Sequence, residues 1–236
     1  MFEIIRRDGL ARIGKFTTKS GRTMETPALL PVVNPKIRTV EPRELYDRFG
    51  FRALITNSYI IRNTPKLKEE AQEKGLHELL DFPGVIMTDS GTFQSHMYGE
   101  VEVTNEEIVE FQKSIGTDIG TVLDIFTEPD WSHEKTKRSL ETTLERTEQA
   151  CGMKGDMMIN GVVQGSVYTD LREYSASAMA PMDVDVHPIG GVVPLMEQYR
   201  YAELVDVVMA SKKGLNPSRP VHLFGCGHPM LLALAT

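Results

Sequence analysis

The chain has little cysteine and no long apolar run. Its two cysteines, Cys151 and Cys226, lie far apart and form no C-x-x-C pair. This excludes a disulfide scaffold and a zinc site built from cysteine, and it indicates a reducing, cytoplasmic location. No stretch approaches the roughly 18 apolar residues of a membrane helix, and the first residues lack the apolar run of a signal peptide. We therefore expect no membrane association.

The composition is that of one globular domain with a large core, with 41% hydrophobic and 25% charged residues among 236. The net charge of −7 is uneven, because residues 1–80 hold 15 Lys and Arg against 10 Asp and Glu, and the remainder holds 11 against 23. An acidic chain attracts a phosphate backbone weakly. If the partner is a nucleic acid, the basic first third or another part of the protein must supply the attraction to its phosphates. The alternative is that the acidic residues form only a solvated surface.

Two kinds of β pattern follow one another along the chain. Residues 1–28 resemble antiparallel strands with turns at Asp8-Gly9 and Ser20-Gly21. From residue 29 onward, short apolar runs alternate with helical patterns, which indicates a mainly parallel sheet covered by helices. The runs span 28–33, 53–56, 85–88, 119–123, 157–163, 184–189 and 221–224.

Start signals place helices between these runs. A capping box opens at Thr104, a Glu-Pro pair opens a helix at Glu41, and Ser132 opens a long one. Thr169 is expected to cap another, and residues 196–213 read as one helix. Seven strand and helix units favour a (β/α)8 barrel that is truncated one strand short, since the last apolar pattern breaks off at residue 236. We expect a β extension over 1–28 and an incomplete barrel over 29–236.

Polar side chains and glycines follow the apolar runs, where a barrel carries its chemistry. Each also has a structural explanation: Asp89 and Asp124 as caps, Gly190-Gly191 as a tight turn, Gln164 as a loop amide. Phe93 and Phe224 fit a core equally well. The residues alone therefore indicate only a barrel enzyme with carboxylates. The segments concerned are 57–58, 88–94, 124, 164–165, 190–194 and 225–229.

Four motifs stand at or just after the apolar runs. They are Thr-Asp-Ser-Gly-Thr-Phe-Gln at 88–94, Gly-Val-Val-Gln-Gly at 161–165, Ile-Gly-Gly at 189–191, and His-Leu-Phe-Gly-Cys-Gly-His-Pro at 222–229. Together they resemble the tRNA-guanine transglycosylase family, in its archaeal, archaeosine-pathway branch, and the resemblance covers essentially the whole chain in order.

The resemblance implies a (β/α)8 enzyme that exchanges a guanine in the D-arm of tRNA for 7-cyano-7-deazaguanine. Exchange at ribose C1′ with retention implies double displacement, and the target base must leave the stack. By match to the family, Asp124 accepts the guanine N1 and N2 hydrogens, and Phe93 and Phe224 sandwich the base. The residues expected to bind the base's other groups are Gln164, Gly190, Gly191 and Val192.

The resemblance assigns Asp89 to catalysis, either as general acid/base, which we favour, or as nucleophile. The family continues into an eighth strand with a second Asp, a cysteine-rich zinc site and C-terminal RNA-binding domains, none of which occurs in these 236 residues. The zinc ligands of the full-length family are thus absent here. The alternative is a catalytically incomplete or non-catalytic base-binding subunit, with a homodimer or partner chain supplying the missing part.

Overall fold

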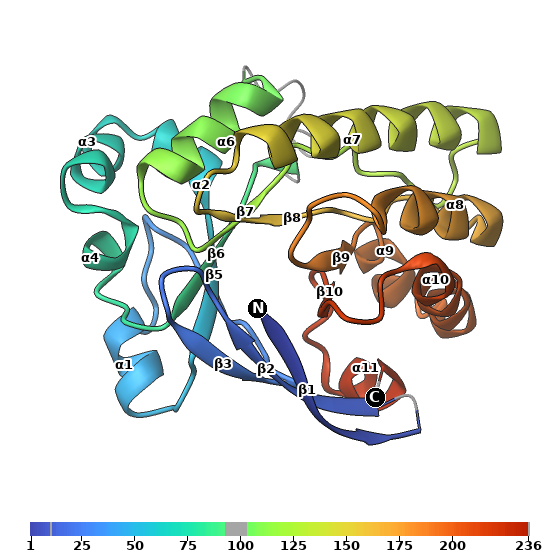
Figure 1. Cartoon of the computed structure of the whole chain (residues 1–236), viewed down its shortest axis with the longest axis horizontal. Helices are drawn as coiled ribbons and strands as arrows, with labels where there is room; N and C mark the ends of the chain where they lie inside the picture. The colour runs from blue at the N-terminus through green and yellow to red at the C-terminus, as the bar shows by residue number, and fades with distance from the viewer. Residues whose placement is uncertain (10, 93–102, 236) are drawn as a thin grey trace. The chain divides into compact units, whose positions relative to one another are not determined.

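The computed structural model describes residues 1–9, 11–92 and 103–235 (Figure 1). The chain forms two compact units. The first contains Met1–Leu123 and Gly152–Ile159, and the second contains Asp124–Cys151 and Asn160–Thr236. Within the described ranges, no helix combines the length and apolar character needed to cross a membrane.

The first unit opens with the expected antiparallel sheet, drawn in blue in Figure 1. Its strands β1 (Phe2–Asp8), β2 (Ala11–Thr17) and β3 (Thr23–Thr26) pair in the order β1-β2-β3. The register joins Phe2 to Phe16 and Phe16 to Met24. Phe16 and Met24 are buried, while alternate residues face outward, as a half-buried sheet requires.

A five-stranded parallel sheet follows in the order β4-β5-β6-β7-β8, which confirms five of the predicted strands. Most of its residues are buried, because helices cover parallel sheets on their faces. The first strand is much shorter than its apolar run. The bounds are β4 (Val32–Val33), β5 (Ala53–Asn57), β6 (Val85–Asp89), β7 (Ile119–Thr121) and β8 (Met158–Asn160).

The predicted capping box is present at the start of α6 (Asn105–Ser114). Thr104 Oγ1 accepts from Glu107 N at 3.2 Å, and Glu107 Oε2 accepts from Thr104 N at 3.0 Å. The helix expected at Glu41-Pro42 is α1 (Pro42–Asp47). Three further helices between β5 and β6 were not predicted: α2 (Ser58–Arg62), α3 (Pro65–Lys74) and α4 (Leu76–Leu80).

The second unit contains the two remaining predicted strands, β9 (His187–Ile189) and β10 (Val221–Leu223), which pair in parallel. Isolated parallel bridges join Asn160 to Val186 and Val163 to Ile189. Apolar residues of β9, α9 and α10, with Cys226 and Leu231, form its core. Its helices are α7 (His133–Met153), α8 (Thr169–Met179), α9 (Val193–Glu197), α10 (Tyr201–Gly214) and α11 (Pro229–Ala235).

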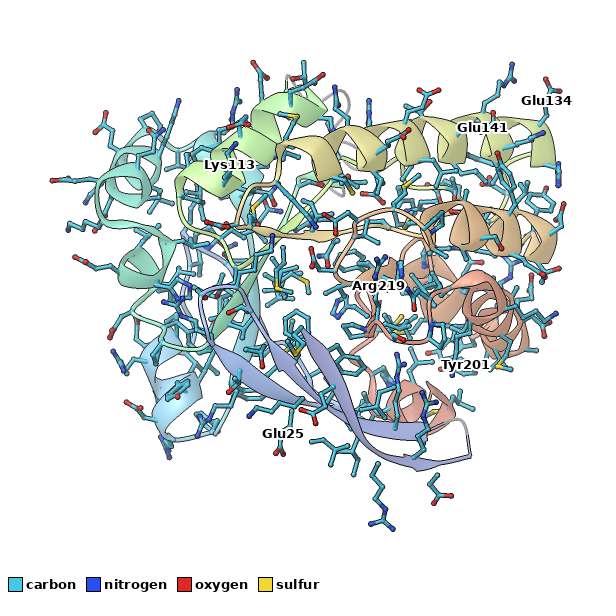
Figure 2. All side chains as sticks on the ribbon, viewed as in Figure 1. Glu25, Lys113, Glu134, Glu141, Tyr201 and Arg219 are labelled. Atoms are coloured by element: carbon cyan, nitrogen blue, oxygen red, sulfur yellow. The ribbon has the colours of Figure 1, made fainter. Side chains whose placement is uncertain are left out.

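The long helix predicted after Ser132 is α7, whose outer face carries charged side chains. Figure 2 shows Glu134 and Glu141 pointing away from this helix. They lie 3.7 Å from Arg138 and 4.0 Å from Lys137, one turn away in each case. Such exposed pairs contribute little stability, and the acidic and basic side chains of α7 are equal in number, so this face is a solvated surface of balanced charge.

Two helix predictions are wrong. Tyr168, not Thr169, is the N-cap of α8, and Thr169 is its first helical residue. The helix expected over 196–213 is two helices, because Tyr199 adopts a φ of +58° that an α-helix cannot continue through. The chain leaves α9 after Glu197 and starts α10 at Tyr201.

Candidate functional site

Asp89 is the last residue of β6, and in the paired register it lies opposite Asn57 at the end of β5. Asn57 Nδ2 lies 3.4 Å from Asp89 Oδ2, and the Ser58 hydroxyl donates to the Asp89 carbonyl at 2.7 Å. Asn57 Oδ1 also caps α2 by accepting from Ile60 N at 2.9 Å. The half-buried carboxylate is thus held at the carboxyl edge of the sheet, where parallel folds bind ligands.

A buried amide behind Asp89 holds β6 and β7 together. Gln112 of α6 accepts from the Thr88 hydroxyl at 2.6 Å and from Thr121 N at 2.9 Å through the same Oε1. Its Nε2 donates to the Thr121 carbonyl at 2.9 Å. Since Thr88 directly precedes Asp89, this network fixes the strand end from which the carboxylate projects.

In the second unit, Asp124 and Gln164 form a buried pair. Gln164 Nε2 donates to Asp124 Oδ2 at 2.6 Å, and Gln164 Oε1 accepts from the Thr127 hydroxyl at 2.9 Å. Because Oε1 faces a donor and Nε2 faces a carboxylate, the orientation of the amide is determined. No helix begins at Asp124, because the next helix, α7, starts at His133, and Gln164 is fully buried, so neither the cap nor the exposed loop-amide explanation accounts for them.

Thr127 links this pair to the loop after β8. Its Oγ1 accepts from Gly165 N at 3.2 Å and from Ser166 N at 2.8 Å while donating to Gln164. Ser166 has a φ of +51° and donates its hydroxyl to the Glu128 carbonyl at 2.6 Å. One hydroxyl therefore satisfies three neighbours and makes the loop conformation specific.

Arg172 of α8 lies beneath the same loops and is fully buried. Its Nε donates to the Ser166 carbonyl, and its Nη1 donates to the carbonyls of Val163 and Gly190, each at 2.8 Å. Burial lowers the pKa of Arg172 to about 9, which still leaves the guanidinium charged at pH 7.

The glycines after β9 form a tight turn that lies against the amide of Gln164. Gly191 has a φ of +68°, and a Cβ built there would lie 3.0 Å from Gln164 Oε1 and 3.1 Å from the Thr127 carbonyl. Val192 is buried in the core, so only its backbone can face a ligand. The tight turn is therefore present and brings backbone close to Gln164, while the binding of a base there stays a prediction.

Two aromatic residues were predicted to sandwich a base. Phe93 lies outside the described residues. Phe224 follows β10 and is partly buried, with its ring edge-on to His222 at a centroid distance of 4.8 Å. Nearby Cys226 is buried in the core, and burial raises the pKa of its thiol to about 12, so it behaves as a small apolar residue.

The structure brings Asp124, Gln164, Gly190 and Gly191 together in the second unit and places Asp89 at a sheet edge of the first. Sequence reasoning missed Thr127, Ser166 and Arg172. The signal for Arg172 is its place on the buried stripe of α8, shared with Ser175, Ala176 and Met179 at helical spacing. Thr127 and Ser166 carry no comparable signal.

A metal site is not formed by the residues described in the two units. They contain no group of three or more His, Cys, Asp or Glu side chains that could hold an ion, and neither cysteine forms a disulfide. With two cysteines in the whole sequence, the chain does not supply the ligand set of a cysteine-rich zinc site.

Comparison with known proteins gives consistent matches. A model of the family described as "Queuine tRNA-ribosyltransferase" matches residues 8–236. A tRNA-guanine(15) transglycosylase of Thermococcus kodakarensis is 58% identical over 99% of this chain and 40% of its own length. Proteins of the same description from Pyrococcus furiosus and Methanosarcina mazei are 56% and 54% identical, over 40% and 48% of their lengths. The chain thus spans less than half the length of these relatives.

Proposed function

The chain belongs to the queuine tRNA-ribosyltransferase family, and from this premise we propose that it is the base-binding and catalytic part of a tRNA-guanine(15) transglycosylase. The reaction replaces a guanine in the D-arm of tRNA by 7-cyano-7-deazaguanine in a cytoplasmic pathway leading to archaeosine. The observation that carries the proposal is the buried Asp124–Gln164 pair. Guanine presents a matching pattern of adjacent donors and a carbonyl.

In this proposal Asp124 accepts hydrogen bonds from N1–H and N2–H2 of guanine. A buried carboxylate is suited to two adjacent donors, and such charge-assisted bonds are the strong ones. An amide nitrogen carries two hydrogens, so Gln164 Nε2 can donate to Asp124 and also to the base carbonyl. The Gly191 N–H would be a second donor to that carbonyl, and Phe224 would stack on the ring with Phe93.

Asp89 would work at the glycosidic bond. Exchange with retention needs two groups, one that attacks C1′ and one that handles the proton of the base. We propose that Asp89 is the general acid/base and that the second carboxylate comes from the part of the relatives' length that this chain does not span. If Asp89 is instead the nucleophile, its substitution should likewise abolish exchange.

The parallel strands of the two units would belong to one (β/α)8 barrel of this family's type, to which this chain contributes seven strands. The expected division into residues 1–28 and 29–236 stays a prediction. The basic balance of residues 1–80 fits contact with tRNA phosphates. A homodimer or a partner chain supplying the rest stays an alternative.

The proposal is tested by exchanging segments between relatives. The 234 matching residues of the Thermococcus kodakarensis protein are replaced by those of this chain, and uptake of labelled guanine into tRNA is measured. We expect the chimera to exchange guanine and Asp89→Asn to remove activity at least 10³-fold, because Asn keeps the shape but not the basicity. A folded chimera without exchange, or a fully active Asp89→Asn chimera, would overturn the catalytic proposal.

Base recognition is tested separately on the 236-residue chain. Calorimetry should show binding of guanine and 7-cyano-7-deazaguanine but not adenine, which presents an acceptor at N1. Asp124→Ala should weaken guanine binding by about 100-fold, because two donors lose a charged acceptor. Binding of guanine without any exchange in the chimera would favour the non-catalytic alternative.

A further inference from the structure

The second unit contains a buried cation that the proposed mechanism does not yet use. Arg172 is 0% exposed, and no carboxylate of the described residues forms an ion pair with it; burial is the sole cause of its lowered pKa. Its Nη2 is buried and donates to no described residue. An unpaired buried charge is costly, so it persists only where its hydrogen bonds matter.

The three acceptors of Arg172 all belong to the strand ends and loops around Gln164. Ser166 and Val163 flank that residue in sequence, and Gly190 lies on the opposite loop, where a Cβ would come within 2.5 Å of Gln164 Nε2. Gly190 N also donates to the Val163 carbonyl at 3.0 Å. The guanidinium thus fastens the loop after β8 to the turn after β9.

This fastening also fixes the direction of the next peptide group. The Gly190–Gly191 bond is trans, and in a trans peptide the C=O and the following N–H point in opposite directions. Since the Gly190 carbonyl accepts from Arg172, the Gly191 N–H points away from the guanidinium. No acceptor among the described residues takes this N–H, so it is available to a ligand.

We infer that Arg172 is a positioning residue which aims the Gly191 N–H at the carbonyl of the bound guanine, an inference that rests on the proposed function. A cation bound to the Gly190 carbonyl also polarises that peptide and strengthens its N–H as a donor. The same polarised peptide stabilises negative charge that develops on the departing base. Arg172 thereby acts on the substrate without touching it.

The test uses a base that differs from guanine only at this carbonyl. 6-Thioguanine keeps the N1 and N2 hydrogens but offers sulfur, a weaker acceptor, to the Gly191 N–H. Calorimetry with both bases gives a preference for guanine in the parent chain, and Arg172→Met should reduce this preference by about tenfold. Arg172→Lys keeps the charge but cannot span three carbonyls, so it should recover only part of the preference.

A matched control removes another arginine that binds carbonyls. Arg219, labelled in Figure 2, donates through Nη1 to the Met182 carbonyl at 2.7 Å and to Ala180 O at 3.4 Å. Arg219→Met should leave the preference for guanine over 6-thioguanine unchanged. If it lowers the preference as Arg172→Met does, the effect is not specific to the Gly190 carbonyl and the inference fails.

The outcomes separate this inference from the proposed function. Equal loss of affinity for both bases in Arg172→Met would mean a merely structural role and would overturn the inference, while guanine recognition stood. Should Arg172→Met not fold, an unchanged preference in folded Arg172→Lys would overturn it equally. A parent chain that binds guanine no better than adenine would overturn the proposed base recognition itself, and this inference with it.

Discussion

The backbone of Gly191 lies close to Gln164 and to the Thr127 carbonyl, so a larger residue there would disturb both. Its φ of +68° belongs to the left-handed region, and a Cβ there would press against Gln164 Oε1 at 3.0 Å and the Thr127 carbonyl at 3.1 Å. In Gly191→Ala, we expect guanine affinity to fall at least tenfold, because the added methyl meets Gln164 Oε1 and the rigid Thr127 carbonyl. The melting temperature should fall by only a few degrees, since the strain is about 1–3 kcal/mol.

The matched control for that substitution is Gly152→Ala. Gly152 lies in α7, a Cβ added there would meet no atom within 4 Å, and its φ is not positive. Alanine there should stabilise the chain by about 1 kcal/mol and leave guanine binding unchanged. Calorimetry and thermal melting check both variants, and unchanged guanine binding in Gly191→Ala would remove Gly191 from the site.

Sequence reasoning found the residues at strand ends and missed those that hold them. Asp124, Gln164 and Gly191 follow apolar runs, and that position alone makes them candidates. Thr127 bonds to residues 37 to 39 positions away, so no local pattern reveals it. The binding of a base by these side chains stays a prediction, because their juxtaposition does not itself show a ligand.

At the scale of elements, one side chain of α6 joins two strands. Gln112→Leu keeps the volume but leaves the Thr88 hydroxyl and both Thr121 backbone groups without this partner. We expect a loss of about 3 kcal/mol in unfolding free energy, measured by urea denaturation. Gln72→Leu on an exposed face of α3 is the control and should change stability by no more than about 0.5 kcal/mol. A loss below about 1 kcal/mol in Gln112→Leu would contradict the proposed joint.

Strand β9 contains a buried histidine, His187, which we expect to make the second unit sensitive to acid. Burial, and then the charge of Arg219, lower the pKa of His187 from 6.5 to about 4. Between these values the unfolded chain binds a proton that the folded chain does not, so stability falls as pH falls from 6.5 to 4. The gap corresponds to at most about 3 kcal/mol.

His187→Leu should remove this contribution. Unfolding free energy measured from pH 7 to pH 4 should then decline less steeply than in the parent chain. His228→Gln, at an exposed position, is the control and should follow the parent curve. Identical slopes for His187→Leu and the parent chain would show that His187 does not control the acid sensitivity.

The strands were predictable as elements because each is an apolar run bounded by turn residues. Two helices after β5 were not, because α2 and α4 are only 5 residues each, too short for a periodic pattern. The helix between them, α3, starts at Pro65 and ends before Gly75, a signal that our prediction missed. The break between α9 and α10 depends on the backbone of Tyr199, a residue whose side chain gives no warning of a positive φ. Local sequence therefore predicts where apolar surface is buried better than where a helix is interrupted.

At the scale of the whole molecule, the chain matches relatives more than twice as long along less than half of their lengths. The net charge of this chain predicts how strongly it binds tRNA by itself. With a net charge of −7, the chain alone should bind tRNA weakly and lose that binding steeply with added salt, because its attraction comes from few lysines and arginines. High affinity would require basic surface elsewhere in a longer protein.

The strands at the sheet edges are where we expect the chain to associate with itself. Within the described residues β4 pairs only with β5, and β10 pairs only with β9. Val32 and Val221 are 80% and 37% exposed on these strands. Unpaired apolar edges recruit other strands, so we expect the chain to self-associate, with a sedimentation mass that rises with concentration.

Val221→Lys should lower that mass, because a lysine on an edge strand opposes pairing. Ile37→Lys removes an equally apolar side chain, 71% exposed, outside any strand, and should leave association unchanged. A monomer at all concentrations, or equal effects of the two lysines, would show that the strand edges do not drive association.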